Sequence, residues 1–216
     1  MTKTIVKRGV TELVTPGLSY NDKVLENGSN NFLASIFFGS EKSGIAFLDI
    51  STGEFLLGEG NANYIGKLLQ SFKPAEILFR KDQKNLLQSV NESQIHSFGL
   101  DDWAFSFDFG FESLTRHFKT NGLKGFGIEE LNFGIASAGA IMHYLSETRH
   151  EHLQHISSIS RLEEHQFVWL DRFTVRNLEI FGSNHEKGTS LIDVIDKTIS
   201  PMGKRLLKRW LALPLK

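Results

Sequence analysis

The sequence contains no cysteine. It therefore has no disulfide framework and no thiolate chemistry, which favours a reducing cytoplasm as its compartment. No apolar run approaches the roughly 18 residues of a membrane span, and the N-terminus lacks the apolar segment of a signal peptide. The formal net charge of −1 argues against strong non-specific binding of nucleic acid by the chain as a whole.

Hydrophobic residues make up 40% of the 216 residues and include 18 phenylalanines, which predicts a globular chain with a large aromatic core. Residues 32–38 are nearly all apolar, as expected of a strand buried on both faces. Residues 44–51 and 54–58 flank Thr52-Gly53 and predict a hairpin. A helical spacing over 61–72 and a further strand over 76–79 indicate a mixed α/β layer fold.

A short helix is predicted over residues 82–90 and a strand over 94–98. Two longer helices are expected after them. Residues 108–119 predict a helix that directs Phe111, Leu114 and Phe118 inward. Residues 133–148 are apolar almost all round, which is typical of a helix buried between layers. This helix is expected to join the α/β part to an all-helical part, with the boundary near Glu151.

Residues 170–215 predict an N-capped helix and an amphipathic helix. Asp171 stands where it would cap a helix that ends before Gly182. Ser200-Pro201 is a helix start, because the hydroxyl caps and Pro loses no needed N–H. The helix that follows has an apolar half that is expected to be buried and a basic half that is expected to be solvated. The apolar half is Met202, Gly203, Leu206, Leu207, Trp210, Leu211 and Leu213, and the other half is Lys204, Arg205, Lys208, Arg209 and Ala212.

These residues carry a family resemblance. Leu-Asp-x-x-Thr-x-x-Asn-Leu-Glu from Leu170, Ser-Leu-Ile-Asp from Ser190 and Thr-Ile-Ser-Pro-Met-Gly-Lys-Arg-Leu-Leu-Lys-Arg-Trp-Leu-x-x-Pro-Leu from Thr198 resemble the start of the MutS core domain. Ser200 replaces a more usual Thr and keeps the capping hydroxyl. Leu-Val-Thr-Pro-Gly at Leu13 resembles the link after the MutS mismatch-reading domain. Ala46 to Phe55 resembles the central hairpin of the MutS connector domain.

The resemblance implies three segments. Residues 1–17 would be a linker, 18–150 a connector domain with a ribonuclease-H-like mixed sheet and flanking helices, and 151–216 the first part of an all-α core domain. The mismatch reader, the clamp and the ATPase would lie outside this chain.

The resemblance also implies a function. The chain would be a non-catalytic, cytoplasmic part of an ATP-dependent mismatch-recognition dimer of DNA mismatch repair. Its connector would couple nucleotide state to the DNA clamp and dock MutL. It would hold no cofactor, whereas the full-length protein would use ATP and Mg²⁺. Mismatched duplex DNA and a second MutS subunit would bind through domains outside the chain.

A Mg²⁺-dependent, ribonuclease-H-like nuclease is the competing interpretation. Asp49 and Glu54 lie on the predicted hairpin, and Asp101 lies further on beside Asp102; paired carboxylates hold Mg²⁺ in many nucleases. The structural alternative is that Asp49 and Glu54 flank a turn in solvent, and that Asp101 caps the segment after Gly99. Fold alone does not establish catalysis, and MutS connectors are not known as nucleases.

Three other features invite a functional interpretation. Residues 182–189 imitate a phosphate-binding loop, but Lys187 precedes Gly188, which reverses the order that the motif requires, so a solvated loop is expected. Three histidines, His150, His152 and His155, lie near a predicted helix end. Their spacing does not suit a metal, and exposed histidines are expected there. The basic half of the last helix could contact phosphates. A solvated face opposite an apolar stripe is the interpretation that the pattern favours.

A partner surface is the last candidate. In the resemblance, the helix over 108–119 aligns with part of the region that docks MutL. Its outward residues are expected to be Glu112, Ser113 and Arg116. Some family members carry paired Gln where this chain has Glu112-Ser113, so the surface is expected to be shared while the contact chemistry differs.

Overall fold

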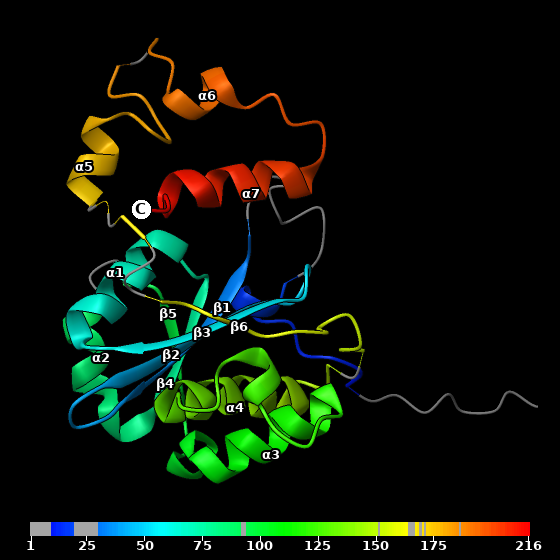
Figure 1. Ribbon diagram of the computed structural model, residues 1–216. Helices are drawn as coiled ribbons and strands as arrows, with labels where there is room; N and C mark the ends of the chain where they lie inside the picture. Colours follow the sequence, from blue (N-terminus) through cyan, green and yellow to red (C-terminus); the bar gives the residue numbers. More distant parts are fainter. Residues whose placement is uncertain are drawn as a thin grey trace, which may run out of the picture.

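A computed structural model of the chain describes residues 10–19, 30–91, 94–150, 152–163, 167–168, 170, 172–185 and 187–216. Figure 1 shows a layered α/β part below and a helical part, from α5 to α7, above it. No helix in the described ranges combines the length and the apolar character needed to cross a bilayer.

A six-stranded mixed sheet forms the centre of the α/β part. Its order is β5-β4-β1-β2-β3-β6. β1 pairs with β2 and β2 with β3 in antiparallel fashion, whereas β4, β5 and β6 add in parallel to their neighbours. The strands are β1 (Phe32–Phe38), β2 (Ser43–Asp49), β3 (Glu54–Gly60), β4 (Glu76–Arg80), β5 (His96–Leu100) and β6 (Ser160–Arg161).

The strands β1 to β5 form where strands were predicted, whereas β6 was not predicted. All seven residues of β2 are buried, which confirms that the central strands are covered on both faces. The turn between β2 and β3 includes Gly53 at φ 74°, a left-handed conformation that glycine adopts without steric cost. The predicted hairpin is thereby confirmed.

One face of the sheet is covered by α1 (Ala62–Phe72) and by α2 (Lys84–Val90), which follows a 3-10 turn at Lys81–Gln83. Asn61 caps α1, because its side chain accepts a hydrogen bond of 2.9 Å from the Tyr64 N–H. The buried face of α1 includes Ile65, Leu68 and Leu69, as its apolar spacing predicted.

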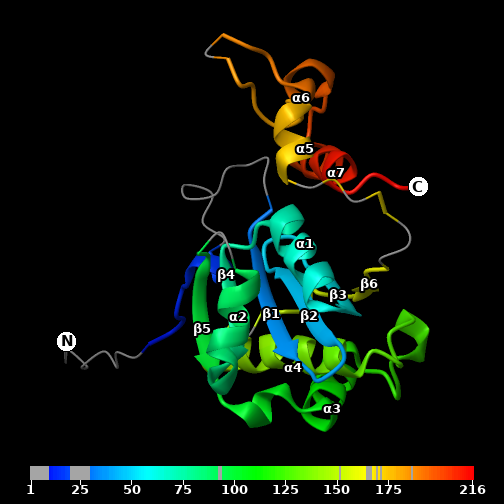
Figure 2. The same cartoon turned by 90° about the vertical axis from the view of Figure 1, so that its left-hand side faces the viewer.

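The other face is covered by α4 (Asn132–Glu147), and α3 (Phe107–Phe118) lies outside α4 (Figure 2). The helix α4 is buried around most of its circumference, as predicted for a helix between layers. Backbones approach closely here: a Cβ on Gly139 would lie 2.4 Å from the Cα of Gly110. Leu114 is buried, and Phe111 and Phe118 pack against the same core, so the predicted inward face of α3 is confirmed.

After α4 the chain returns to the sheet. β6 pairs with β3, and Ile156, Ile159 and Leu162 are buried. The sheet thus continues beyond residue 150, where the connector domain was expected to end. The division into 1–17, 18–150 and 151–216 stays a prediction.

Three helices follow, α5 (Arg172–Asn177), α6 (Leu191–Ile195) and α7 (Pro201–Ala212). The predicted start of α7 is confirmed, because the Ser200 hydroxyl accepts a hydrogen bond of 3.1 Å from the Gly203 N–H. The predicted capping residue Asp171 lies outside the described residues.

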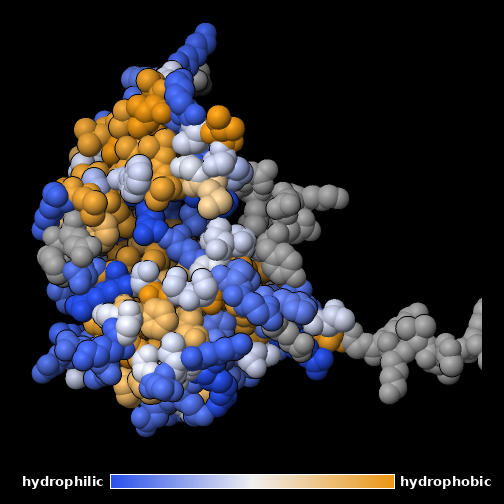
Figure 3. All heavy atoms as spheres, turned by 45° about the vertical axis from the view of Figure 1, so that its right-hand side comes forward, coloured by the Kyte–Doolittle hydropathy of each residue, from blue (hydrophilic) through white to orange (hydrophobic). Residues whose placement is uncertain are grey.

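The helix α7 has the two predicted faces, but their expected environments hold only in part. Lys204 is exposed and Leu213 is buried as expected, whereas most of the basic half is partly shielded and much of the apolar half is exposed. Met202 is 74% exposed and Trp210 is 60% exposed. Arg205, Lys208 and Arg209 instead line a cleft against the α/β part. Figure 3 shows hydrophobic side chains gathered over the upper part of the molecule. One reason is an ion pair: the end of the sheet that faces α7 carries Glu54, which pairs with Arg209 of the basic half.

Candidate functional site

The Asp49 carboxylate closes the β2–β3 hairpin. Its side chain is fully buried and accepts four hydrogen bonds. They come from Ser51 Oγ at 2.6 Å, Asn30 Nδ2 at 2.9 Å, the Ser51 N–H at 3.0 Å and the Asn31 N–H at 3.3 Å. The expectation that Asp49 is solvated is therefore wrong, because the chain around Asn30 folds over it.

Glu54 lies opposite Asp49 in the antiparallel register and connects the sheet to α7. One carboxylate oxygen forms an ion pair with the Arg209 guanidinium, and the other accepts a hydrogen bond of 3.2 Å from Asn30. Burial lowers the pKa of Arg209 from its usual value. An arginine remains charged over the ordinary pH range, so this contact is an ion pair that joins two segments 155 positions apart in the sequence.

The third carboxylate of the nuclease interpretation lies elsewhere. Asp101 follows the end of β5, at an edge of the sheet, and pairs with Lys81 at 2.6 Å. Asp49 pairs in register with Phe32, the first residue of β1. It therefore lies at the end of the sheet opposite to Asp101, which follows the last residue of the parallel strand β5. Within the described ranges, no three acidic or histidine side chains come together as metal ligands. The structure therefore does not favour the nuclease interpretation.

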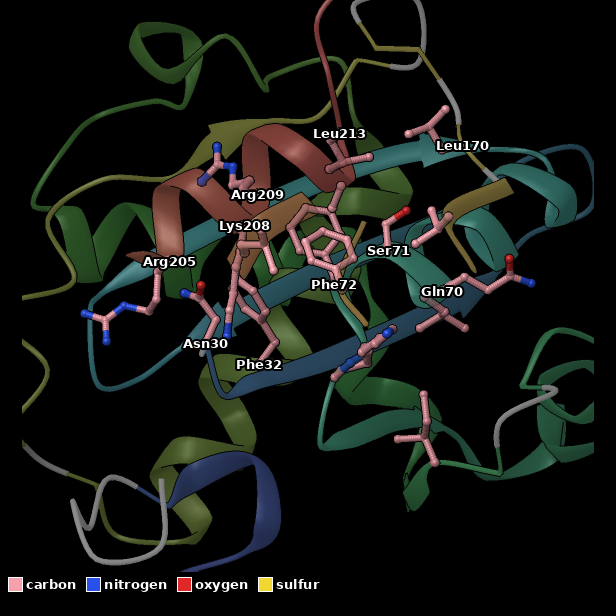
Figure 4. Close-up of a pocket in the computed structure, with 18 residues that line it drawn as sticks. Asn30, Phe32, Gln70, Ser71, Phe72, Leu170, Arg205, Lys208, Arg209 and Leu213 are labelled. Carbon is pink, nitrogen blue, oxygen red and sulfur yellow. The ribbon is translucent and has the colours of Figure 1, made fainter. Parts of the chain in front are cut away.

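A cleft of about 650 Å³ separates the α/β part from the helical part. Figure 4 shows the labelled side chains of α7 on one side of the cleft and those of β1 and α1 on the other. Phe72 stacks on Phe47 with ring centroids 4.5 Å apart and meets Phe32 edge-on at 5.3 Å, so one wall is rigid and aromatic. The other wall is cationic, with Arg205, Lys208 and Arg209.

The α3 surface carries the candidate partner residues. The side chains of Glu112 and Arg116 are 70% and 74% exposed and form an ion pair one helical turn apart. Ser113 is half-buried, so it contributes less to the outward surface than the helical spacing predicted. The exposed chemistry of this surface is therefore an ion pair on the outermost layer of the fold.

The three histidines do not converge. His155 contacts the Ile50 carbonyl at 2.7 Å, and His152 is exposed. His150 is buried, with Nε2 3.1 Å from a Glu12 carboxylate oxygen, so the expectation of an exposed histidine is wrong here. The reason is that the segment around Leu13, whose N–H bonds to the Thr148 carbonyl, covers the end of α4. Burial lowers the pKa of His150.

The loop that imitates a phosphate site lies between α5 and α6. The Glu179 carboxylate accepts a hydrogen bond of 2.8 Å from the Asn184 N–H and one of 3.3 Å from Ser183 Oγ. A carboxylate thus occupies donors that a phosphate loop would offer to its ligand. Glu186 lies outside the described residues.

Sequence reasoning missed a buried carboxylate at the start of β4. Glu76 accepts hydrogen bonds from Thr15 Oγ1 at 2.6 Å, Tyr144 Oη at 2.9 Å and the Gly17 N–H at 3.1 Å. Burial, together with the negative charge of Glu76, raises the pKa of Tyr144 to about 12. The sequence feature that could have indicated this buried carboxylate is a glutamate at the first position of an apolar strand. Its role is to fasten the segment before β1 to the sheet.

Comparison with known proteins agrees with this architecture. Residues 31–157 match the family model described as MutS domain II, and residues 173–216 match MutS domain III. The DNA mismatch repair protein MutS of Flavobacterium johnsoniae and that of Flavobacterium psychrophilum are each 60% identical over 216 residues. The MutS of Christiangramia forsetii is 58% identical over the same length.

All 216 residues align with these relatives, yet the chain spans only 25% of their length. The match includes both the sheet part and the three helices that follow it. The chain therefore belongs to the MutS family of DNA mismatch repair proteins.

Proposed function

We propose that this chain is a non-catalytic segment of a mismatch-recognition protein, in which a connector domain is joined to the first part of a core domain. The observation that carries the proposal is the identity of about 60% to MutS proteins over the whole chain. The ATP, Mg²⁺, mismatched duplex and second subunit of the longer protein would be bound by parts outside these 216 residues. We expect the segment to work in the cytoplasm.

The sheet order supports a ribonuclease-H-like connector. Three antiparallel strands in sequence, β1 to β3, are followed by β4 and β5 in parallel on the other side of β1. Such a sheet is a rigid scaffold, and fold alone implies no nuclease activity. A cleavage assay on an RNA–DNA hybrid with Mg²⁺ is expected to show no product; cleavage that is lost on Asp49→Asn would reverse this conclusion.

The joint between the sheet and α7 supports a mechanical role. The ion pair of Glu54 and Arg209 lies beside a cleft with one aromatic and one cationic wall. A charged contact next to a cleft can open and close without unfolding either part. We propose that this joint transmits the nucleotide state of the longer protein to its DNA clamp.

The exposed ion pair on α3 supports the docking of MutL through Glu112, Ser113 and Arg116. The decisive variant exchanges the two charges, Glu112→Arg with Arg116→Glu, because it keeps an ion pair while it reverses the charge presented at each position. Binding of the cognate MutL, followed by interferometry, is expected to weaken about tenfold, or ~1.4 kcal/mol.

The matched control exchanges the charges of another ion pair, Arg161→Glu with Glu163→Arg, at the β6 edge of the sheet. Its affinity for MutL is expected to equal that of the wild type. Unchanged binding after the α3 exchange would remove this helix from the interface. No binding by the wild-type chain would refute docking through this segment.

A further inference from the structure

In the part of the chain that the structure describes, the strand β5 is an open edge of the sheet. It lies at the margin, beyond β4 (Figure 2). Among the described residues, β4 is the only segment whose backbone is hydrogen-bonded to β5. One side of a five-residue strand therefore presents its backbone groups outward.

Sheet edges are usually protected by short strands, charges or proline. The opposite edge follows this rule, because β6 has two residues and includes Arg161. The sequence of β5, His-Ser-Phe-Gly-Leu, contains no lysine, arginine or proline, and Phe98 is 44% exposed. This edge thus has none of these protections.

A cavity of about 570 Å³ opens along the α4 side of β5. Phe98 forms part of its wall and meets the Tyr144 ring at a centroid distance of 5.4 Å. Residues 13–16 of the same chain form the wall opposite β5, and His96 and Thr148 also line the cavity. Of its two carboxylates, Glu147 has a 56% exposed side chain, whereas Glu76 is buried and already accepts three hydrogen bonds. Asp101 and Asp102 follow the end of the strand and are exposed, with Lys81 paired to the first of them. The accessible acids beside the strand are therefore Glu147, Asp101 and Asp102, and His96 is the exposed basic residue of the strand itself.

We propose that β5 binds an extended peptide segment of a partner protein, which adds to the sheet as a further strand. Main-chain hydrogen bonds to β5 would supply affinity, and the cavity would select alternate side chains. Its lining is mostly apolar and aromatic, with Glu147 as its accessible acid, and fits aliphatic side chains beside cationic ones. The partner segment therefore alternates basic and apolar residues.

A second copy of this chain fits the edge less well. Antiparallel pairing of two β5 strands would bring Asp101 and Asp102 of one copy toward the exposed Glu147 of the other. Carboxylates placed opposite one another are unfavourable. The charges therefore favour a basic partner over self-association.

The test uses the 216-residue chain and a fluorescein-labelled peptide of about nine alternating lysines and valines, the length of an ordinary strand. Fluorescence anisotropy is expected to show saturable binding. A peptide of alternating glutamate and valine is expected to bind at least about tenfold more weakly. Equal binding of the two peptides, or dimerisation of the chain through β5 seen by sedimentation, would overturn the proposal.

Two N-methylated versions of the lysine peptide test the strand geometry. One carries methyl groups on the odd residues and the other on the even residues. An added strand uses only one of its two edges, so one version is expected to lose binding and the other to keep it. If both versions bind, or neither does, strand addition is refuted.

Protein variants locate the site. Phe98→Lys places a charge on the exposed edge and is expected to reduce binding at least about tenfold. Leu86→Lys, at a residue that is 50% exposed on α2, is the matched control and is expected to bind as the wild type does. Glu147→Lys is expected to weaken the lysine peptide and strengthen the glutamate peptide. Circular dichroism verifies that each variant is folded, and loss of binding in Leu86→Lys alone would overturn the assignment to β5.

Discussion

Replacing Asp49 by asparagine decides whether the hairpin carboxylate is a structural acceptor or a metal ligand. The carboxylate receives donors on both oxygens: Ser51 contributes two to Oδ1, and Asn30 and Asn31 contribute one each to Oδ2. An asparagine offers one oxygen and one NH₂ group. It therefore serves one pair of donors and directs its own N–H groups at the other pair.

The expected loss follows from those contacts. A buried donor left without its acceptor costs about 1–3 kcal/mol, so two such donors predict a loss of about 2–6 kcal/mol in the free energy of unfolding. Urea denaturation followed by circular dichroism measures this loss. Asp102→Asn, at an exposed acid, is the control, and its effect is expected to stay within about 0.5 kcal/mol.

The metal-ligand interpretation predicts the opposite sign. Two carboxylates gathered for an ion repel each other when the ion is missing, so neutralising one of them would stabilise the chain in a metal-free buffer. An Asp49→Asn variant as stable as the wild type, or more stable, would refute the structural interpretation.

Two further predictions concern buried groups. Burial lowers the pKa of His150 below its usual 6.5, so its neutral form stabilises the fold; that stability is complete above pH 6.5 and is lost as the pH falls through the lowered pKa. Denaturation at a series of pH values is expected to show a flatter profile for His150→Gln below pH 6.5, and equal profiles would contradict this. Gly139→Ala would place a Cβ 2.4 Å from the Gly110 Cα and is expected to cost about 1–3 kcal/mol. Gly122→Ala, where nothing lies within 4 Å of the added Cβ, is the control in thermal unfolding, and equal midpoints would contradict the close approach.

The segments were predictable because their signals are local. The apolar run over 32–38 coincides with β1, and Ser200-Pro201 marks the start of α7, since strand burial and helix capping depend on neighbouring residues. The inner faces of α1 and α3 also followed from apolar spacing. Local rules decided these features, and tertiary contacts did not override them.

The environment of single polar residues was not predictable. Asp49 and His150 were expected in solvent, and both are buried. Their partners, Asn30 and Glu12, lie 19 and 138 positions away. No local pattern records such a pairing, because the fold alone brings the two segments together.

The sequence by itself determined the strands β1 to β5, the principal helices, the two-faced character of α7 and the membership of the MutS family. Each of these depends on local periodicity or on a run of residues that is read directly. The tertiary structure alone decided which face of α7 meets the sheet, how Glu54 and Arg209 join the two parts, and that β5 is an open edge. The physical reason is that burial and charge pairing depend on distances in space, and segments distant in the sequence set those distances.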